Sequence, residues 1–237
     1  MCHPVRLKGW IRKPNKLSDD LIGVIPFWLE ARRDLRQDQA ATLFSVALLM
    51  NPLLSQHYAE LVKAVTDAEP SLEALDHCAL LIADTLMAGK KILAAGNGGS
   101  AADALHLCEE LVGRYKNNRR AFPAICLSAD GTALTCIAND FGFEEIFSRQ
   151  VEALGEAGDV LVLFTSSGNS ANQLKALHTA RSRDMQVVVL SGCGGGKLKG
   201  LADAEWIVPS KIGARVQELH GWSLHVILEV VEARLLT

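Results

Sequence analysis

The sequence predicts an α/β fold in which helices cover both faces of a five-stranded parallel sheet. From residue 91 onward, short continuous apolar runs alternate with segments of helical periodicity, a pattern typical of strands that are buried on both faces. Two of the runs end in loops rich in glycine or hydroxyl side chains, and ligands bind beyond the carboxyl ends of the strands in such sheets. We therefore expect a three-layer sandwich of flavodoxin-like or Rossmann-like topology, preceded by N-terminal helices.

Two helices are expected before the sheet begins. Apolar residues recur at helical spacing between Pro52 and Asp67. After Pro70 and Ser71, a second helix starts at Leu72 and ends before Gly89, because glycine is the usual residue just beyond a helix C-terminus.

Five apolar runs provide the predicted strands, and helices are expected after the first and the third of them. The first run ends at a Gly-rich loop, which opens a helix over 101–115, and the third ends at a hydroxyl-rich loop followed by a helix to about Arg183. A last helix is expected from about Ala214 to Leu235. The five runs cover 91–95, 124–127, 160–164, 187–190 and 206–208.

Residues 1–49 differ from the remainder of the chain. They mix proline, tryptophan and charge without a sustained period, whereas a much cleaner pattern begins at Met50. We expect residues 50–237 to form the folded domain. Our hypothesis is that residues 1–49 are an N-terminal extension, either disordered or the product of a start assigned upstream of a natural start at Met50.

The composition predicts a cytoplasmic protein with a substantial core. Hydrophobic residues make up 49% of the 237 residues, and a net charge of -3 gives no electrostatic reason to bind nucleic acid or an anionic membrane. No apolar run reaches the roughly 18 residues of a membrane-spanning helix. The six cysteines form no CxxC pair, which favours free thiols in a reducing compartment.

The loop Thr165-Ser166-Ser167-Gly168-Asn169-Ser170 has the character of a phosphate-binding site. It stands between a buried strand and the first turn of a helix, where backbone N–H groups lack intrahelical partners and the helix dipole favours anions. Its four hydroxyls add hydrogen-bond donors without adding charge. The simpler alternative is that Asn169 or Ser170 only caps the helix.

The loop Gly96-Asn97-Gly98-Gly99-Ser100 allows the backbone to approach a ligand closely. Gly96, Gly98 and Ala101 match a loose form of the dinucleotide fingerprint, but the acidic residue expected about 20 positions later is missing. The stretch GCGGGK at 192–197 lacks the first glycine and the final Ser or Thr of a P-loop. We therefore expect no nucleotide cofactor.

Two helices carry polar residues that are candidates for chemistry. His106 and Glu110 stand four residues apart, so they share one face of the helix after the Gly-rich loop. A solvated surface pair is the simpler alternative. Gln217, His220 and His225 lie in the final helix, much of which is apolar, and a buried histidine there needs a polar partner.

Asn139 and Asp140 form a further polar pair. We expect them in a loop after Ile137, where Asp140 either caps the following segment or binds sugar hydroxyls.

Four stretches of the chain carry a family resemblance. They are GNGGSAADALHLCEELVGRY (96–115), ANDFGFEEIFSRQVEALGEAGDV (138–160), TSSGNSANQ (165–173) and PSKIGARVQELH (209–220), with His225 beyond the last. In this order they resemble the sugar isomerase (SIS) domain family and, within it, the bacterial phosphoheptose isomerases. The resemblance covers residues 50–237. It implies a homotetramer that converts sedoheptulose 7-phosphate to D-glycero-D-manno-heptose 7-phosphate, for lipopolysaccharide precursors, at sites on subunit interfaces.

The resemblance also implies roles for individual positions. The acid/base pair falls on Glu110 and His225, and one zinc ion per subunit falls on His106, Glu110, Gln217 and His225. Ala214 stands where some family members carry an acidic residue. The implied substrate-binding positions are Asn97, Gly98, Gly99, Glu110, Asn139, Asp140, Thr165, Ser166, Ser167, Ser170 and Gln217.

These residue types suit the implied reaction. Moving a proton between C2 and C1 through an enediol needs one group that takes the proton and a second that moves protons on the oxygens. A carboxylate and an imidazole suffice. Gln217 and His225 lie eight residues apart, about 12 Å along a helix. We therefore expect either that they come from different subunits at each site or that only one is a direct metal ligand.

The main alternative is a non-enzymatic binding protein of the same fold. Replication-initiator-associating proteins are similar around the AND and ARxQE motifs, but they lack the equivalents of Glu110 and His225. The presence of both residues here favours the enzyme. A sugar-phosphate-sensing regulator and a nicotinamide dehydrogenase are weaker alternatives.

Overall fold

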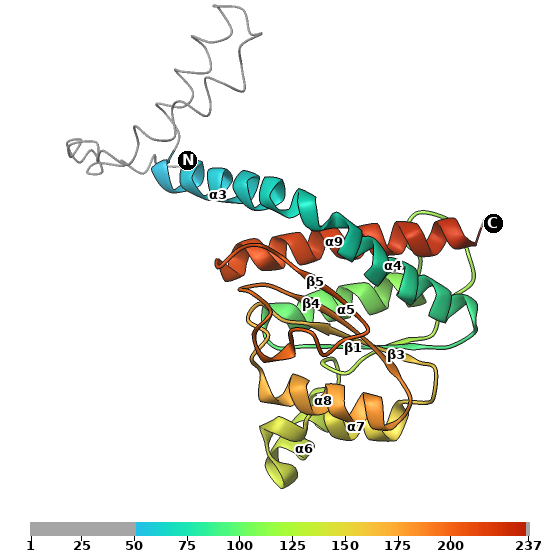
Figure 1. Cartoon of the computed structure of the whole chain (residues 1–237). Coiled ribbons are helices and arrows are strands. Elements are labelled where there is room, and N and C mark those ends of the chain that lie inside the picture. The colour runs from blue at the N-terminus through green and yellow to red at the C-terminus, as the bar shows by residue number, and fades with distance from the viewer. Residues whose placement is uncertain (1–50, 236–237) are drawn as a thin grey trace, which may run out of the picture. The chain divides into compact units, whose positions relative to one another are not determined.

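The computed structural model describes residues 51–235 and contains the predicted five-stranded parallel sheet (Figure 1). The expected extension over 1–49 lies outside the described residues. The strand order is β2-β1-β3-β4-β5, and every neighbouring pair is parallel. The strands are β1 (Ile92–Gly96), β2 (Ala124–Cys126), β3 (Val160–Phe164), β4 (Gln186–Ser191) and β5 (Ala204–Ile207).

Burial explains why the strands read as continuous apolar runs. Every residue of β1 and β3 is buried, and so is every residue of β4 after Gln186. A strand that helices cover on both faces has no face exposed to solvent. Its sequence therefore shows no alternation of apolar and polar residues. The edge strand β2 is short and only partly buried.

Helices form a layer on each face of the sheet (Figure 1). One hydrophobic cluster joins the sheet to α4, α5 and α9, and a second cluster joins its other face to α7 and α8. The α-helices are α3 (Pro52–Ala68), α4 (Leu72–Met87), α5 (Gly99–Val112), α6 (Gly131–Phe141), α7 (Ser148–Leu154), α8 (Ala171–Ser182) and α9 (Gly213–Arg234).

The strand order creates a switch point between β1 and β3. The chain leaves β1 toward β2 on one side and later returns to β3 on the other side. Connections from adjacent strands therefore diverge at their carboxyl ends, which leaves a crevice for a ligand. Both loops singled out in the sequence, 96–100 and 165–170, begin at this crevice.

The prediction of a loop at Asn139 and Asp140 is wrong, because both residues lie in the last turn of α6. The helix begins where the Asp130 side chain accepts hydrogen bonds from the backbone N–H groups of Thr132 (2.9 Å) and Ala133 (3.1 Å). Such capping offsets the modest helix propensity of the sequence between. Gly142, with a φ of 97°, ends the helix.

None of the helices between residues 51 and 235 combines the length and the apolar character needed to cross a lipid bilayer.

Substitution by alanine should have opposite effects on stability at two of the glycines. A Cβ on Gly96 would lie 2.1 Å from the Ser100 carbonyl oxygen, whereas a Cβ on Gly221, inside α9, meets no atom within 4 Å. Gly96→Ala should therefore destabilise the protein by at least about 2 kcal/mol through overpacking. Gly221→Ala should stabilise it by about 0.5–1 kcal/mol, because alanine loses less backbone entropy in a helix. Urea unfolding of both variants measures this, and equal shifts in the same direction would contradict it.

Candidate active site

Helices α5 and α9 lie side by side on one face of the sheet and run in the same direction (Figure 1). Residues more than 100 positions apart in the sequence therefore meet turn by turn. We call this line of contacts the α5–α9 seam. From one end to the other, it pairs Gly99 with Gln217, Asp103 with His220, and His106 with His225.

One end of the seam brings together His106, Glu110 and His225. The Nε2 atom of His106 lies 3.7 Å from Oε1 of Glu110, and the His106 and His225 ring centroids are 5.1 Å apart at nearly right angles. Tyr115, just beyond α5, stacks on His225 at 5.4 Å with an interplanar angle of 17°. A carboxylate and two imidazoles thus converge there.

The two adjacent glutamates of α5 differ in environment. Ligand atoms of His106, Glu109 and Glu110 all lie within 4.8 Å of one another, so the three residues together resemble a cation site. The Glu109 side chain is 62% exposed and its carboxylate is 4.0 Å from His106, whereas the Glu110 side chain is 20% exposed. Glu110 is therefore the carboxylate held within the seam.

The middle of the seam contains a buried imidazole beside a partly buried carboxylate. His220 is fully buried, and its Nδ1 lies 4.0 Å from Oδ2 of Asp103, while its Nε2 lies 3.4 Å from the Ser191 carbonyl oxygen. Burial raises the pKa of Asp103 to about 6 and lowers the pKa of His220 to about 4. Both shifts favour neutral forms, as expected for ionisable groups removed from water.

The Gly-rich loop after β1 is held from two sides. The side chains of Asn97 and Asn172 exchange two hydrogen bonds of 3.0 and 2.9 Å, which tie this loop to the start of α8. A Cβ on Gly99 would lie 2.5 Å from the Gln217 side-chain amide. Only glycine therefore allows this amide to pack against the backbone at the start of α5. The side-chain amide of Asn97 is thus engaged within the protein.

The hydroxyl-rich loop between β3 and α8 presents donors at a helix N-terminus. The Thr165 hydroxyl accepts from Gly168 N–H (3.1 Å), and Ser167 accepts from Asn169 N–H (3.3 Å). Ser170 occupies the N-cap position, yet its side chain makes no capping bond. The simpler reading of Ser170 as only a cap therefore lacks support, and the first turn of α8 keeps the N–H groups that bind anions.

The Gly-rich stretch 192–197, which fails as a P-loop, packs behind the hydroxyl-rich loop. Gly168 has a φ of 66°, and a Cβ there would lie 1.8 Å from the Gly195 carbonyl oxygen. The hydrogen bond from Gly168 N–H to the Thr165 hydroxyl and this close backbone approach together fix the conformation of the hydroxyl-rich loop.

Asn139 and Asp140 are not brought to the seam by the fold of one subunit. They lie on α6, in the layer on the other face of the sheet from α5 and α9 (Figure 1). The side-chain amide of Asn139 donates to Asp140 at 2.7 Å.

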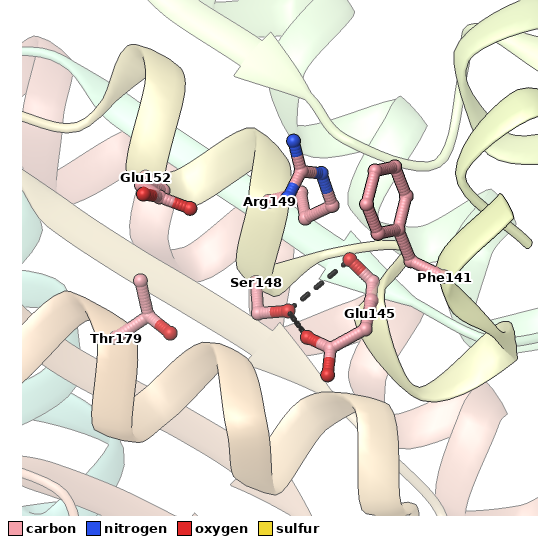
Figure 2. A pocket seen from close by; sticks show the side chains of 6 residues that line it. All are labelled: Phe141, Glu145, Ser148, Arg149, Glu152 and Thr179. Atoms are coloured by element: carbon pink, nitrogen blue, oxygen red, sulfur yellow. Dashed lines mark hydrogen bonds between the residues drawn. The ribbon is translucent and has the colours of Figure 1, made fainter.

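A cavity of about 290 Å³ lies beside these residues, among α6, α7 and α8 (Figure 2). Inside it, Arg149 stacks over the Phe141 ring at 3.8 Å, and the Ser148 hydroxyl donates to Glu145. None of the predicted site residues lines this cavity, so we place the candidate site at the crevice and the seam rather than here.

Tyr115, Asp103 and Asn172 stand at the site but were given no role from the sequence. Each lies in or beside a motif that was recognised. The residue that each of them contacts, however, is 75 or more positions away in the chain. No spacing rule within a single helix or loop signals such a pair.

Comparisons with known proteins agree with this geometry. The SIS domain family model matches residues 56–192. The phosphoheptose isomerase of Sodalis glossinidius is 48% identical over 165 residues, which are 69% of this chain and 84% of that protein. The phosphoheptose isomerase of Serratia proteamaculans is 45% identical over 173 residues, 73% of this chain and 89% of that protein.

Two solved structures are also similar. The phosphoheptose isomerase from Neisseria gonorrhoeae has a TM-score of 0.71 and 43% identity, covering 76% of this chain and 97% of that one. The phosphoheptose isomerase from Francisella tularensis has a TM-score of 0.73 and 32% identity, covering 77% and 98%. With its fold, its seam and these relatives, this chain belongs to the SIS domain family, alongside the phosphoheptose isomerases.

Proposed function

We propose that this chain is a ketose–aldose isomerase that converts sedoheptulose 7-phosphate to D-glycero-D-manno-heptose 7-phosphate. The observation that carries the proposal is the cluster of Glu110, His106 and His225 on the α5–α9 seam. The hydroxyl-rich loop adds a helix N-terminus suited to an anion. The relatives named phosphoheptose isomerase support this substrate. We place the reaction in the cytoplasm, supplying heptose for lipopolysaccharide precursors.

Binding and chemistry use different parts of the site. The Thr165–Ser170 loop and the first turn of α8 hold the 7-phosphate with neutral donors, and Asn97–Gly99 and Gln217 bind the sugar chain. The phosphate is remote from C1 and C2, so its binding orients the sugar. Ala214, in place of an acid found in some family members, lies exposed in the first turn of α9 and leaves this role to the other residues.

The isomerisation needs only proton transfers. The Glu110 carboxylate takes a proton from C1 of the ketose and returns it to C2, so that the carbonyl group moves from C2 to C1 through an enediol. The His225 imidazole takes the proton leaving O1 and gives a proton to O2. No electrons leave the substrate, and both side chains end in their starting states.

The first prediction concerns Glu110. Glu110→Gln removes the carbon base while retaining size and hydrogen bonding, so turnover should fall by at least about 100-fold. Aldose formation from sedoheptulose 7-phosphate, followed by NMR, measures it. Glu109→Gln removes the neighbouring, more exposed carboxylate and should keep most of the activity.

Two outcomes would contradict this proposal. Equal losses in both variants would mean that Glu110 has no special role. Tight binding of the sugar phosphate by the parent protein without turnover, in a folded and zinc-supplied sample, would favour the binding protein of the replication-initiator-associating type.

We further propose that the site holds one zinc ion per subunit, with His106, Glu110, Gln217 and His225 as the candidate ligands. Because Gln217 and His225 lie at opposite ends of the seam on one helix, either they come from different subunits at each site or only one of them binds the ion directly. Two ligands bound tetrahedrally at about 2.0–2.1 Å stand about 3.4 Å apart, close to the 3.7 Å between His106 and Glu110. The donor set of imidazole and carboxylate suits zinc. When bound, the ion would supply Lewis-acid polarisation of substrate oxygens.

Metal content tests the zinc proposal. His106→Ala should lower zinc affinity by at least about 10-fold, because one of few ligands is lost. Elemental analysis after dialysis against limiting zinc measures the occupancy, and His178→Ala, at an exposed position of α8, is the matched control. Retention of zinc by both variants alike would contradict the ligand assignment.

We also propose that the chain forms a homotetramer with sites at subunit interfaces. In the described part of α6, no residue is buried, although four apolar side chains lie half-buried on one face. Phe141 is 53% exposed and Phe143 is 62% exposed. Contact with a second copy would cover these rings and bring Asn139 and Asp140 toward a neighbouring seam.

Light scattering coupled to size exclusion tests the assembly. The parent should elute as a tetramer, and Phe143→Asp should shift it toward smaller species, since a charge cannot be buried there without a partner. Leu72→Asp, at an exposed first turn of α4 where an acid is tolerated, should remain tetrameric. A monomeric parent, or a Phe143→Asp protein with unchanged mass, would overturn the proposed interface.

A further inference from the structure

One buried carboxylate on α9 holds the loop that follows α5. Glu232 is 4% exposed. Its oxygens accept hydrogen bonds from the backbone N–H groups of Tyr115 (3.3 Å), Lys116 (3.3 Å) and Asn117 (2.9 Å). The Asn117 side-chain amide adds another at 2.9 Å. Burial alone would raise the pKa of Glu232, but these donors and Arg119 outweigh it and hold the pKa below its ordinary value.

Arg119 extends this connection to the last turn of α5. Its Nε donates to Glu232 at 3.1 Å, and both side chains are almost fully buried. Its other nitrogens donate to the carbonyl oxygens of Glu110 (2.7 Å) and Leu111 (2.9 Å). The guanidinium therefore bridges the backbone of Glu110 to α9, and it satisfies carbonyls that a helix end leaves without partners.

The same loop places Tyr115 against His225. The rings are stacked at 5.4 Å and 17°, and the edge-on ring of His106 approaches His225 at 5.1 Å and 82°. The χ2 torsion of a histidine is broad, because it joins an sp³ carbon to an sp² ring. The backbone of α9 therefore leaves the imidazole plane undetermined, and packing against the Tyr115 and His106 rings restricts it.

We propose that Tyr115 is a positioning residue that sets the ring plane of His225, and that the Glu232–Arg119 ion pair keeps Tyr115 in place. The inference deepens the proposed isomerase and rests on it for the role of His225. The Tyr115 ring acts by stacking, so its hydroxyl is dispensable. Glu232 and Arg119 act through the loop and through the carbonyl of Glu110.

The spectroscopic test needs no substrate. With ring-labelled histidine, the His225 signals are assigned by their absence in a His225→Gln variant. Stacking on tyrosine shifts the His225 ring protons upfield. Tyr115→Phe should keep this shift, whereas Tyr115→Leu, which preserves apolar packing without an aromatic ring, should remove it. His225 signals that are unchanged in Tyr115→Leu would overturn the proposal.

The kinetic test separates positioning from binding. Tyr115→Leu should lower kcat on sedoheptulose 7-phosphate about 10-fold with little change in KM, because the substrate still binds but the imidazole is misaligned. Tyr115→Phe should stay within about twofold of the parent. Equal losses in the two variants would show that the hydroxyl matters and would overturn positioning by stacking.

Glu232→Gln tests the support of the loop with a side chain of the same shape. It weakens the bond to Arg119 and should reproduce part of both effects of Tyr115→Leu, with circular dichroism confirming the fold. If the His225 ring signals of Glu232→Gln were the same as those of the parent, Glu232 would have no part in keeping Tyr115 in place. If the parent protein failed to turn over the sugar phosphate, the proposed isomerase function would be wrong. The stacking of Tyr115 on His225 would still be tested by the NMR comparison of Tyr115→Phe with Tyr115→Leu.

Discussion

The parallel packing of α5 against α9 is the constraint on which the site depends. Both helices run the same way along one face of the sheet, so equivalent turns meet in order. The contact of Gln217 with the Gly-rich loop at Gly99, the Asp103–His220 pair and the cluster of rings at His106 follow from this one arrangement. Apolar packing of α9 into the core, through residues such as Leu224 and Leu228, holds it there.

The proposed site separates neutral binding from ionisable chemistry. The crevice at the switch point offers hydroxyls, amides and backbone N–H groups, which could bind a phosphate without a buried cation that must itself be neutralised. The ionisable side chains stand instead in the seam. The loops are held by internal bonds, such as the two hydrogen bonds between the Asn97 and Asn172 amides, while the proposed acid/base residues Glu110 and His225 stand on helices.

Two buried polar pairs in the helical layer contrast with each other. Glu232 and Arg119 satisfy one another and several backbone groups, so their burial carries little penalty for unmade hydrogen bonds. Asp103 and His220 stand 4.0 Å apart with shifted pKa values that favour neutral forms. The first pair gives rigidity beside Glu110, while in the second pair burial moves the pKa of each group in the direction that favours its neutral form.

The sequence by itself determined the local elements of this protein. Continuous apolar runs, glycine stops and helical periodicity predicted the five strands and the helices around them, because each depends on neighbours within a few residues. The motifs also predicted the loops at Asn97 and Thr165. The helices α6 and α7 were missed. The signal for α6 was the single cap at Asp130, and its polar end resembled a loop. Only the tertiary structure decided which turn of α5 meets which turn of α9, that Glu110 rather than Glu109 faces the seam, and that Tyr115 covers His225. Those pairings depend on how whole helices pack, and packing is set by contacts between residues more than 100 positions apart, for which no local spacing carries a signal.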